Sequence, residues 1–171
     1  MSLRVISGSA RGRKLVSVKG DLTRPITDRV KESLFDIIGA DVAASRWWDM
    51  FAGTGAVGIE ALSRGAAFAR FTDLHREPIE TIKANLIATR LDSSAEVQRA
   101  DAFKLMASTP DMTFDYVYIA PPQFRELWSA ALTLLDANHA WLSPDAWAVV
   151  HDGGSRDALT AASSWAGLAR R

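Results

Sequence analysis

Cysteine is absent from the 171-residue sequence, so the chain can form no disulfide and no thiolate metal site. The three histidines, His75, His139 and His151, lack the spacing typical of metal ligands, and we expect no metal. No apolar run approaches the roughly 20 residues that a membrane-spanning helix needs, and the N-terminus lacks the charged-then-apolar order of a signal peptide. We therefore expect a soluble, cytoplasmic protein with no membrane partner.

The net charge is zero, but the charges are segregated along the chain. Residues 1–31 hold eight Lys or Arg against two Asp, a net charge of +6, and the remaining 140 residues carry −6. Such a basic segment is typical of proteins that contact phosphate backbones, because binding releases counterions. The alternative interpretation is a solvated, charged hairpin.

The order of local patterns predicts an α/β fold in a single domain, 1–171. A basic hairpin and helix fill 1–39: two short β-like runs flank a Gly- and Arg-containing turn, and an amphipathic helix starts near Thr27 or Asp28 and stops at Gly39. Its apolar face is predicted to hold Val30, Leu34, Ile37 and Ile38. A core over 46–151 alternates expected strands (46–51, 68–73, 95–101, 114–120, 147–151) with expected helices (57–63, 78–89, 102–107, 125–136).

Three glycines open one of these helices directly after a strand. Gly53, Gly55 and Gly58 form G-x-G-x-x-G, a pattern that lets a ligand approach the backbone at a helix N-terminus. Asp73 lies 20 residues beyond Gly53, at the end of the next strand, where a carboxylate can accept hydrogen bonds from ribose hydroxyls. The motif therefore predicts a nucleoside cofactor, with a glycine turn needed only for helix packing as the alternative.

Asp49 indicates which nucleoside. It lies four residues before Gly53, where a carboxylate would repel a pyrophosphate but attract a cation. S-adenosylmethionine carries an ammonium and a sulfonium and no phosphate, so Asp49 favours it over a nicotinamide dinucleotide. Asp49 could instead cap the neighbouring helix.

Five segments resemble one family: "RVISGSARGRKL", "TRPITDRVKESLFDIIG", "DMFAGTGAVGIEALSRGA", "TDLHREPIETIKANL" and "FDYVYIAPPQF". In order along residues 3 to 150, they resemble the RsmD family, bacterial methyltransferases that modify the exocyclic N2 of a guanine in 16S ribosomal RNA. The resemblance implies a Rossmann-like S-adenosylmethionine-dependent methyltransferase fold with a mostly parallel, doubly wound sheet. It also implies 16S ribosomal RNA or the small ribosomal subunit as partner, and a monomer is expected by default.

The resemblance assigns roles to two sets of residues. The cofactor would be held by residues at the strand ends, namely Asp49, Phe51, Gly53, Thr54, Gly55, Asp73, Leu74, Asp101 and Ala102. The RNA would face the basic N-terminal region, namely Arg11, Arg13, Lys14, Arg24, Thr27 and Arg29.

The catalytic stretch departs from the family pattern, which has Asp or Asn, then two prolines, then Tyr or Phe. In this chain the stretch is Ala120, Pro121, Pro122, Gln123 and Phe124. The side-chain acceptor for the guanine amine is thus missing, and the Pro121 carbonyl, the Gln123 amide and the Phe124 ring are the candidate replacements. Three interpretations follow: a working variant, an enzyme for another base in RNA or DNA, or an inactive module that binds cofactor and RNA.

The tail, 152–171, is short for a family that closes its sheet with an antiparallel hairpin. We expect one short helix and a poor strand there, with Trp165 and Leu168 packing at the sheet edge. The other five tryptophans are predicted to pack in the core or at an interface, namely Trp47, Trp48, Trp128, Trp141 and Trp147.

Overall fold

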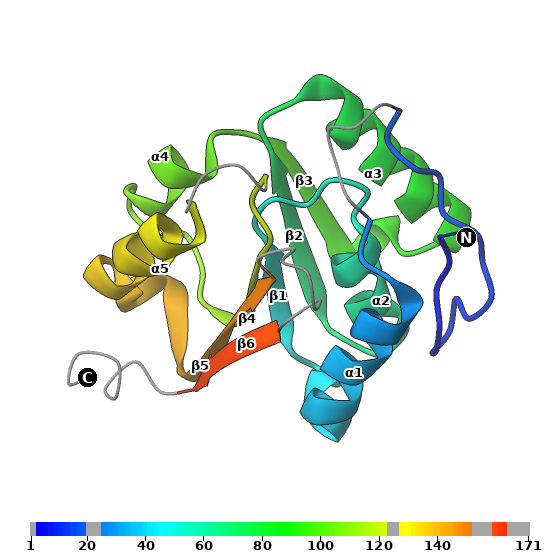
Figure 1. The fold of residues 1–171 in the computed structure, drawn as a ribbon, viewed down its shortest axis with the longest axis horizontal. Coiled ribbons are helices and arrows are strands. Elements are labelled where there is room, and N and C mark those ends of the chain that lie inside the picture. Colours follow the sequence, from blue (N-terminus) through cyan, green and yellow to red (C-terminus); the bar gives the residue numbers. More distant parts are fainter. Residues whose placement is uncertain (1–2, 20–24, 123–126, 152–158, 164–171) are drawn as a thin grey trace.

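The computed structural model describes residues 3–19, 25–122, 127–151 and 159–163. Its centre is a six-stranded sheet with the strand order β3-β2-β1-β4-β5-β6 (Figure 1). The first five strands run parallel, and β6 pairs antiparallel with β5 at the edge. The strands are β1 (Arg46–Asp49), β2 (Phe68–Asp73), β3 (Ala95–Arg99), β4 (Phe114–Ile119), β5 (Leu142–His151) and β6 (Leu159–Ser163).

Helices cover both faces of this sheet, as a doubly wound α/β fold requires. Figure 1 shows α1 (Asp28–Ile38), α2 (Ala56–Ser63) and α3 (Arg76–Thr89) on one face, and α4 (Ala102–Met106) and α5 (Leu127–Ala137) on the other. Short 3₁₀ helices, η1 (Gly39–Val42), η2 (Asp92–Ser94) and η3 (His139–Trp141), join neighbouring elements. The fold prediction is thereby confirmed, and most strands and helices lie close to the expected positions, but β5 begins at Leu142 rather than at residue 147.

Each face of the sheet has its own apolar core. Trp47 and Phe71 point to the α1–α3 side, where Trp47 stacks on Phe35 of α1 at a centroid distance of 5.4 Å. Trp48 and Trp141 meet on the α4–α5 side, 4.9 Å apart. Because successive side chains of a strand point to opposite faces, the pair at 47 and 48 supplies one tryptophan to each core.

The amphipathic helix has the predicted bounds, and three of the four residues predicted for its apolar face are buried, namely Val30, Leu34 and Ile38. Thr27 caps α1, its hydroxyl accepting from the Val30 amide at 3.3 Å. The prediction for Ile37 is wrong: its side chain is 64% exposed, while Lys31 and Phe35 are buried. Lys31 can lie in the core because the buried carboxylate of Glu60 on α2 pairs with it.

The N-terminal segment is only partly the hairpin expected. Its two runs pair antiparallel at a single bridge between Arg4 and Lys14, with the Leu15 amide donating to the Leu3 carbonyl at 2.8 Å. The segment is bent because it follows the surface of the helices: Gly8 has φ +86°, and a Cβ there would lie 1.8 Å from the Ser63 carbonyl oxygen. Backbone contacts with α2 thus replace regular strand pairing.

The tail supplies one antiparallel strand, β6, which pairs with β5 over five residues. Trp165 and Leu168 lie outside the described residues. Three tryptophans are fully buried as predicted, at 47, 48 and 141, and Trp147 is half-buried, but Trp128 is 37% exposed on α5 and does not pack in the core. Over the described ranges, no helix is long and apolar enough to cross a membrane.

Candidate cofactor and nucleic-acid site

The site is built where β1 and β4 end side by side. The two strands are neighbours although they are far apart in sequence, with Asp49 in register with Tyr118. In a doubly wound sheet, the crevice at such a switch point lies outside the carboxyl ends of the strands and binds ligands. The glycine loop that follows β1 and the diproline stretch that follows β4 therefore lie at the edge of the sheet where this fold places its ligand crevice.

Asp49 has one oxygen in use and one without a partner. Its Oδ2 accepts a hydrogen bond from the Gly58 amide in the first turn of α2, at 3.2 Å. Its Oδ1 is buried and has no hydrogen-bond partner among the described residues. Burial raises the pKa of Asp49 to about 8; the Gly58 amide opposes this rise, and the charge of Asp73 adds to it. Asp49 therefore caps α2, as the alternative interpretation had it, and also offers an acceptor suited to a cation.

The glycine loop holds backbone conformations that favour glycine. Gly53 has φ +54° and Gly55 φ +77°, the left-handed region. Asp73 closes the loop from β2: its Oδ2 accepts from the Gly53 amide at 3.1 Å, and its Oδ1 accepts from the His75 amide at 3.0 Å. The third glycine serves packing, because a Cβ on Gly58 would lie 2.4 Å from the Phe71 ring.

The remaining expected cofactor residues surround the ends of β1, β2 and β3. Asp101 caps α4, accepting from the Phe103 amide at 2.9 Å, and Ala102 begins that helix in a buried position. The Phe51 ring lies 5.8 Å from the Phe103 ring. Leu74 is exposed, whereas Thr54 is buried. These residues thus follow three neighbouring strands at one edge of the sheet.

The diproline stretch follows β4 directly. Ala120 is half-buried against the α1–α3 core, Pro121 is buried and Pro122 is exposed. Gln123 and Phe124 lie outside the described residues. On β4, just before this stretch, the Tyr118 hydroxyl lies 3.0 Å from His151 Nδ1. Burial, together with the Asp49 charge, raises the pKa of Tyr118 well above its usual value.

The described part of the basic segment that precedes α1, residues 3–19, lies along α2 and α3 (Figure 1). Four of the basic residues expected to face RNA lie in the described part of the chain and are exposed, namely Arg11, Arg13, Lys14 and Arg29. Thr27 is exposed as well. Arg13 also donates to the Ala88 carbonyl at the end of α3, at 2.7 Å. Arg24 lies outside the described residues.

Sequence reasoning missed two buried polar side chains that hold this segment in place. Glu60 accepts from the amides of Ile6 and Ser7 at 2.9 and 3.0 Å and pairs with Lys31 at 3.2 Å. Asn85 bonds Val16 of the segment. The sequence signal for both residues was a polar side chain at a position expected to be apolar. Glu60 interrupts an otherwise apolar helix, and Asn85 follows Ile82 by three residues, which places it on the same face of the helix.

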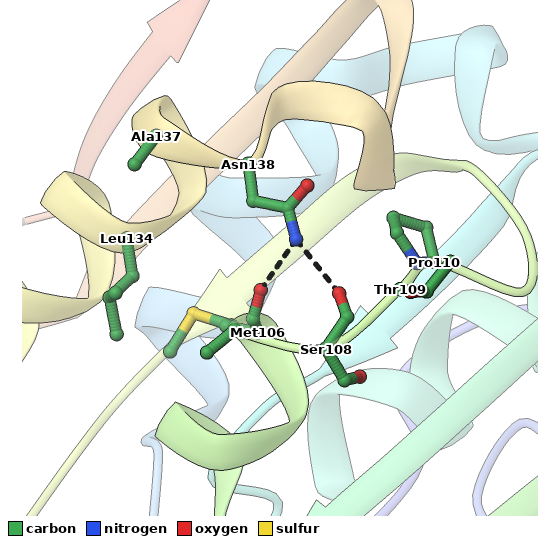
Figure 2. Close-up of a pocket in the computed structure, with 8 residues that line it drawn as sticks. Met106, Ser108, Thr109, Pro110, Leu134, Ala137 and Asn138 are labelled. Atoms are coloured by element: carbon green, nitrogen blue, oxygen red, sulfur yellow. Dashed lines mark hydrogen bonds between the residues drawn. The ribbon is translucent and has the colours of Figure 1, made fainter.

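The cavity in Figure 2 is separate from this crevice. It has a volume of about 510 Å³ and lies between the turn after α4 and the C-terminal part of α5. The Asn138 amide spans it, donating to the Met106 and Ser108 carbonyls at 2.9 Å each. Both segments lead into the amino ends of β4 and β5, so the cavity lies at the opposite end of the sheet from Asp49.

The fold and the site define a class of protein: a Rossmann-like methyltransferase whose cofactor is S-adenosylmethionine. An RNA methyltransferase from Salinibacter ruber, solved with S-adenosyl-L-homocysteine, has the same fold at 17% identity, with a TM-score of 0.61 over 74% of this chain and 76% of that one. More specifically, the model of the family described as conserved hypothetical protein 95 matches residues 3–171, and the chain belongs to this family.

Curated relatives agree with that assignment and confirm the resemblance to the RsmD family. YlbH of Bacillus subtilis is 42% identical over 153 residues, covering 88% of this chain and 83% of YlbH. The Escherichia coli ribosomal RNA small subunit methyltransferase D is 34% identical, over 95% of this chain and 81% of that protein. The solved structure of Escherichia coli yhhF has a TM-score of 0.77 at 35% identity, over 88% of this chain and 80% of that one.

Proposed function

We propose that this methyltransferase transfers a methyl group to the exocyclic N2 amine of a guanine in 16S ribosomal RNA. The observation that carries the proposal is the meeting of three features at one edge of the sheet: the unpartnered Asp49 oxygen, the glycine loop closed by Asp73, and the diproline end of β4. The basic segment held on the adjoining helices supports a polyanionic substrate. The names of the curated relatives support ribosomal RNA.

In the proposed reaction, one set of residues binds the cofactor and another orients the incoming amine. When bound, S-adenosylmethionine supplies a methyl group on a sulfonium that already activates it for transfer. Asp49 would hold the cofactor's ammonium, because its free oxygen is buried and needs a cationic donor. Asp73 would hold the ribose, and Asp101 and Ala102 would lie beside the adenine. Pro121 gives the acceptor side a rigid backbone without an N–H, which leaves carbonyl oxygens to orient the incoming amine.

Ala120 is the residue expected to affect the rate of methyl transfer most. The family's carboxylate or amide at this position would orient the guanine amine, and its loss removes one preorganised acceptor. If a backbone carbonyl did not replace it, the transition state would lose on the order of 3 kcal/mol, or about a hundredfold in rate. We therefore expect measurable methyltransferase activity, at a lower rate than in family members that keep the carboxylate or amide.

The direct test uses purified protein, S-adenosylmethionine labelled in the methyl group, and small ribosomal subunits or their free RNA from cells lacking the modification. Incorporation at a guanine N2, located by mass spectrometry of nuclease fragments, is the expected result. Asp49→Ala is the matched negative control. No incorporation at any guanine, under conditions where a relative from the same family is active, would refute the proposal.

A second candidate function rests on Ala120 and Gln123, which replace the family's acceptor and aromatic residues: a module that binds cofactor and RNA without turnover. Under that function, Ala120→Asn combined with Gln123→Tyr should create activity where the wild type has none. Under the first function, the same double variant raises a rate that is already measurable. Competition between RNA and DNA of the same sequence separates an RNA enzyme from an amino-methylase acting on DNA.

A further inference from the structure

One buried side chain joins the basic segment to the glycine loop. Asn85 lies on α3, fully buried. Its Oδ1 accepts from the Val16 amide at 2.7 Å, and its Nδ2 donates to the Val16 carbonyl at 3.0 Å and to the Thr54 carbonyl at 3.0 Å. Thr54 lies between Gly53 and Gly55 in the cofactor loop.

These bonds use both amide protons and leave no choice of orientation. The side chain pairs with the amide and carbonyl of Val16 as a neighbouring strand would, and its second proton goes to the glycine loop. Reversing the amide would set its NH₂ against the Val16 amide and its oxygen against two carbonyls. Asn85 therefore fixes the segment and the loop relative to each other through one buried side chain.

The other anchors of the segment lie elsewhere. Glu60 and Ser63 hold residues 6–10 towards the C-terminal end of α2, and Arg13 reaches the end of α3. Among the hydrogen bonds of the described residues, only those of Asn85 connect the segment to residues 53–55. The hydrogen bonds of a single side chain would thus transmit a displacement of the Thr54 carbonyl to Val16.

We propose that Asn85 is a positioning residue that couples cofactor binding in the glycine loop to the placement of the basic segment. The coupling deepens the proposed function, because it assumes that this segment receives the RNA. Cofactor binding orders the loop, Asn85 transmits the loop position to Val16, and the segment is then set for the substrate. By thermodynamic linkage, RNA bound to the segment strengthens cofactor binding by the same factor.

The test compares Asn85→Asp with a matched control on the same helix. Asn85→Asp keeps the shape and the acceptor for the Val16 amide, but it replaces the NH₂ group by an oxygen that can donate to at most one of the two carbonyls, and only when it is protonated. Thr89→Val is the control: Thr89 is also buried, and its hydroxyl donates only within α3, to the Asn85 and Leu86 carbonyls. Asn85→Ala serves as a second variant if Asn85→Asp does not fold.

The first readout needs no RNA. Hydrogen exchange of peptides covering residues 13–18 is measured with and without S-adenosylhomocysteine. In the wild type and in Thr89→Val, this ligand should slow exchange of these peptides at least about fivefold, the low end of ordinary coupling between sites. In the Asn85 variants the slowing should vanish there and persist in peptides covering the glycine loop. A purely structural role would speed exchange equally in both states and preserve the ligand-dependent ratio, which would overturn the proposal.

The second readout is calorimetric affinity for S-adenosylhomocysteine with and without saturating small-subunit RNA. The wild type should gain at least about fivefold in affinity with RNA, and the Asn85 variants should lose that gain. An equal gain in the variants would overturn the coupling. If the wild type binds no RNA, the proposed function fails, while the exchange experiment still decides the link between loop and segment.

Discussion

The titration of Asp49 makes the sharpest prediction. Its carboxyl is 2% exposed and has one oxygen without a partner, and its pKa is raised from the ordinary 3.8 to about 8. The free protein therefore carries Asp49 protonated at neutral pH. Asp49→Asn keeps the shape and the neutral charge, and its amide oxygen can still accept from the Gly58 amide.

The magnitude follows from linkage. Because the folded pKa lies above the unfolded one, the folded state binds the proton more tightly, and the resulting stability is complete below about pH 4 and is lost as pH rises towards 8. Each pH unit inside this window removes about 1.4 kcal/mol. Between pH 5 and pH 7, Asp49 should lower the free energy of unfolding by about 2–3 kcal/mol. Asp49→Asn should lack this contribution.

The assay is urea unfolding of wild type and Asp49→Asn, free of cofactor, at several pH values between 5 and 8. The difference between the two curves isolates Asp49 from other titrating groups. In the wild type, binding of S-adenosylmethionine at pH 7 should also release close to one proton, measured by calorimetry in buffers of different ionisation enthalpy, because the ammonium favours the carboxylate. Parallel stability profiles for the two proteins, or no proton release, would refute the reasoning.

Three further predictions concern packing around the site. Glu60→Gln should lower the free energy of unfolding by about 3–5 kcal/mol in a denaturant titration, because it leaves the buried Lys31 ammonium uncompensated; an unchanged midpoint would contradict this. Gly58→Ala should cost about 1–3 kcal/mol in thermal unfolding, because its Cβ meets the Phe71 ring at 2.4 Å, and Phe71→Leu should recover part of the loss. Gly8→Ala should weaken RNA binding in a filter assay while leaving cofactor affinity near the wild type, because its Cβ would lie 1.8 Å from a carbonyl oxygen of α2 and displace the basic segment.

The order of elements could be predicted because local signals agree along this chain. β2 has the predicted bounds, 68–73, and α1 begins after its Thr27 cap and ends before Gly39, where capping chemistry marks both ends. The crevice could be predicted too, because parallel strands place their carboxyl ends at one edge. Asp49, Gly53 and Asp73 meet there for that reason.

Contacts between distant segments could not be predicted from local patterns. Periodicity placed Ile37 on the buried face of α1, but Lys31 is buried and Ile37 is exposed, because the carboxylate of Glu60, 29 positions after Lys31, makes burial of the lysine possible. The N-terminal hairpin is likewise reduced to one bridge, because its amides bond side chains of α2 and α3. Pairings of this kind depend on the assembled fold rather than on any window of sequence.

A site that binds a polyanion beside a carboxylate must keep that carboxylate from repelling its substrate, and the burial of Asp49 meets this requirement in both states. In the free protein the raised pKa keeps Asp49 neutral, so this residue adds no negative charge near the basic segment. In the proposed cofactor complex the carboxylate is ionised, but its charge is paired with that of the cofactor's ammonium. Under the proposed function, Asp49 is therefore either neutral or paired with the ammonium whenever RNA approaches, and in neither state does it repel the phosphates.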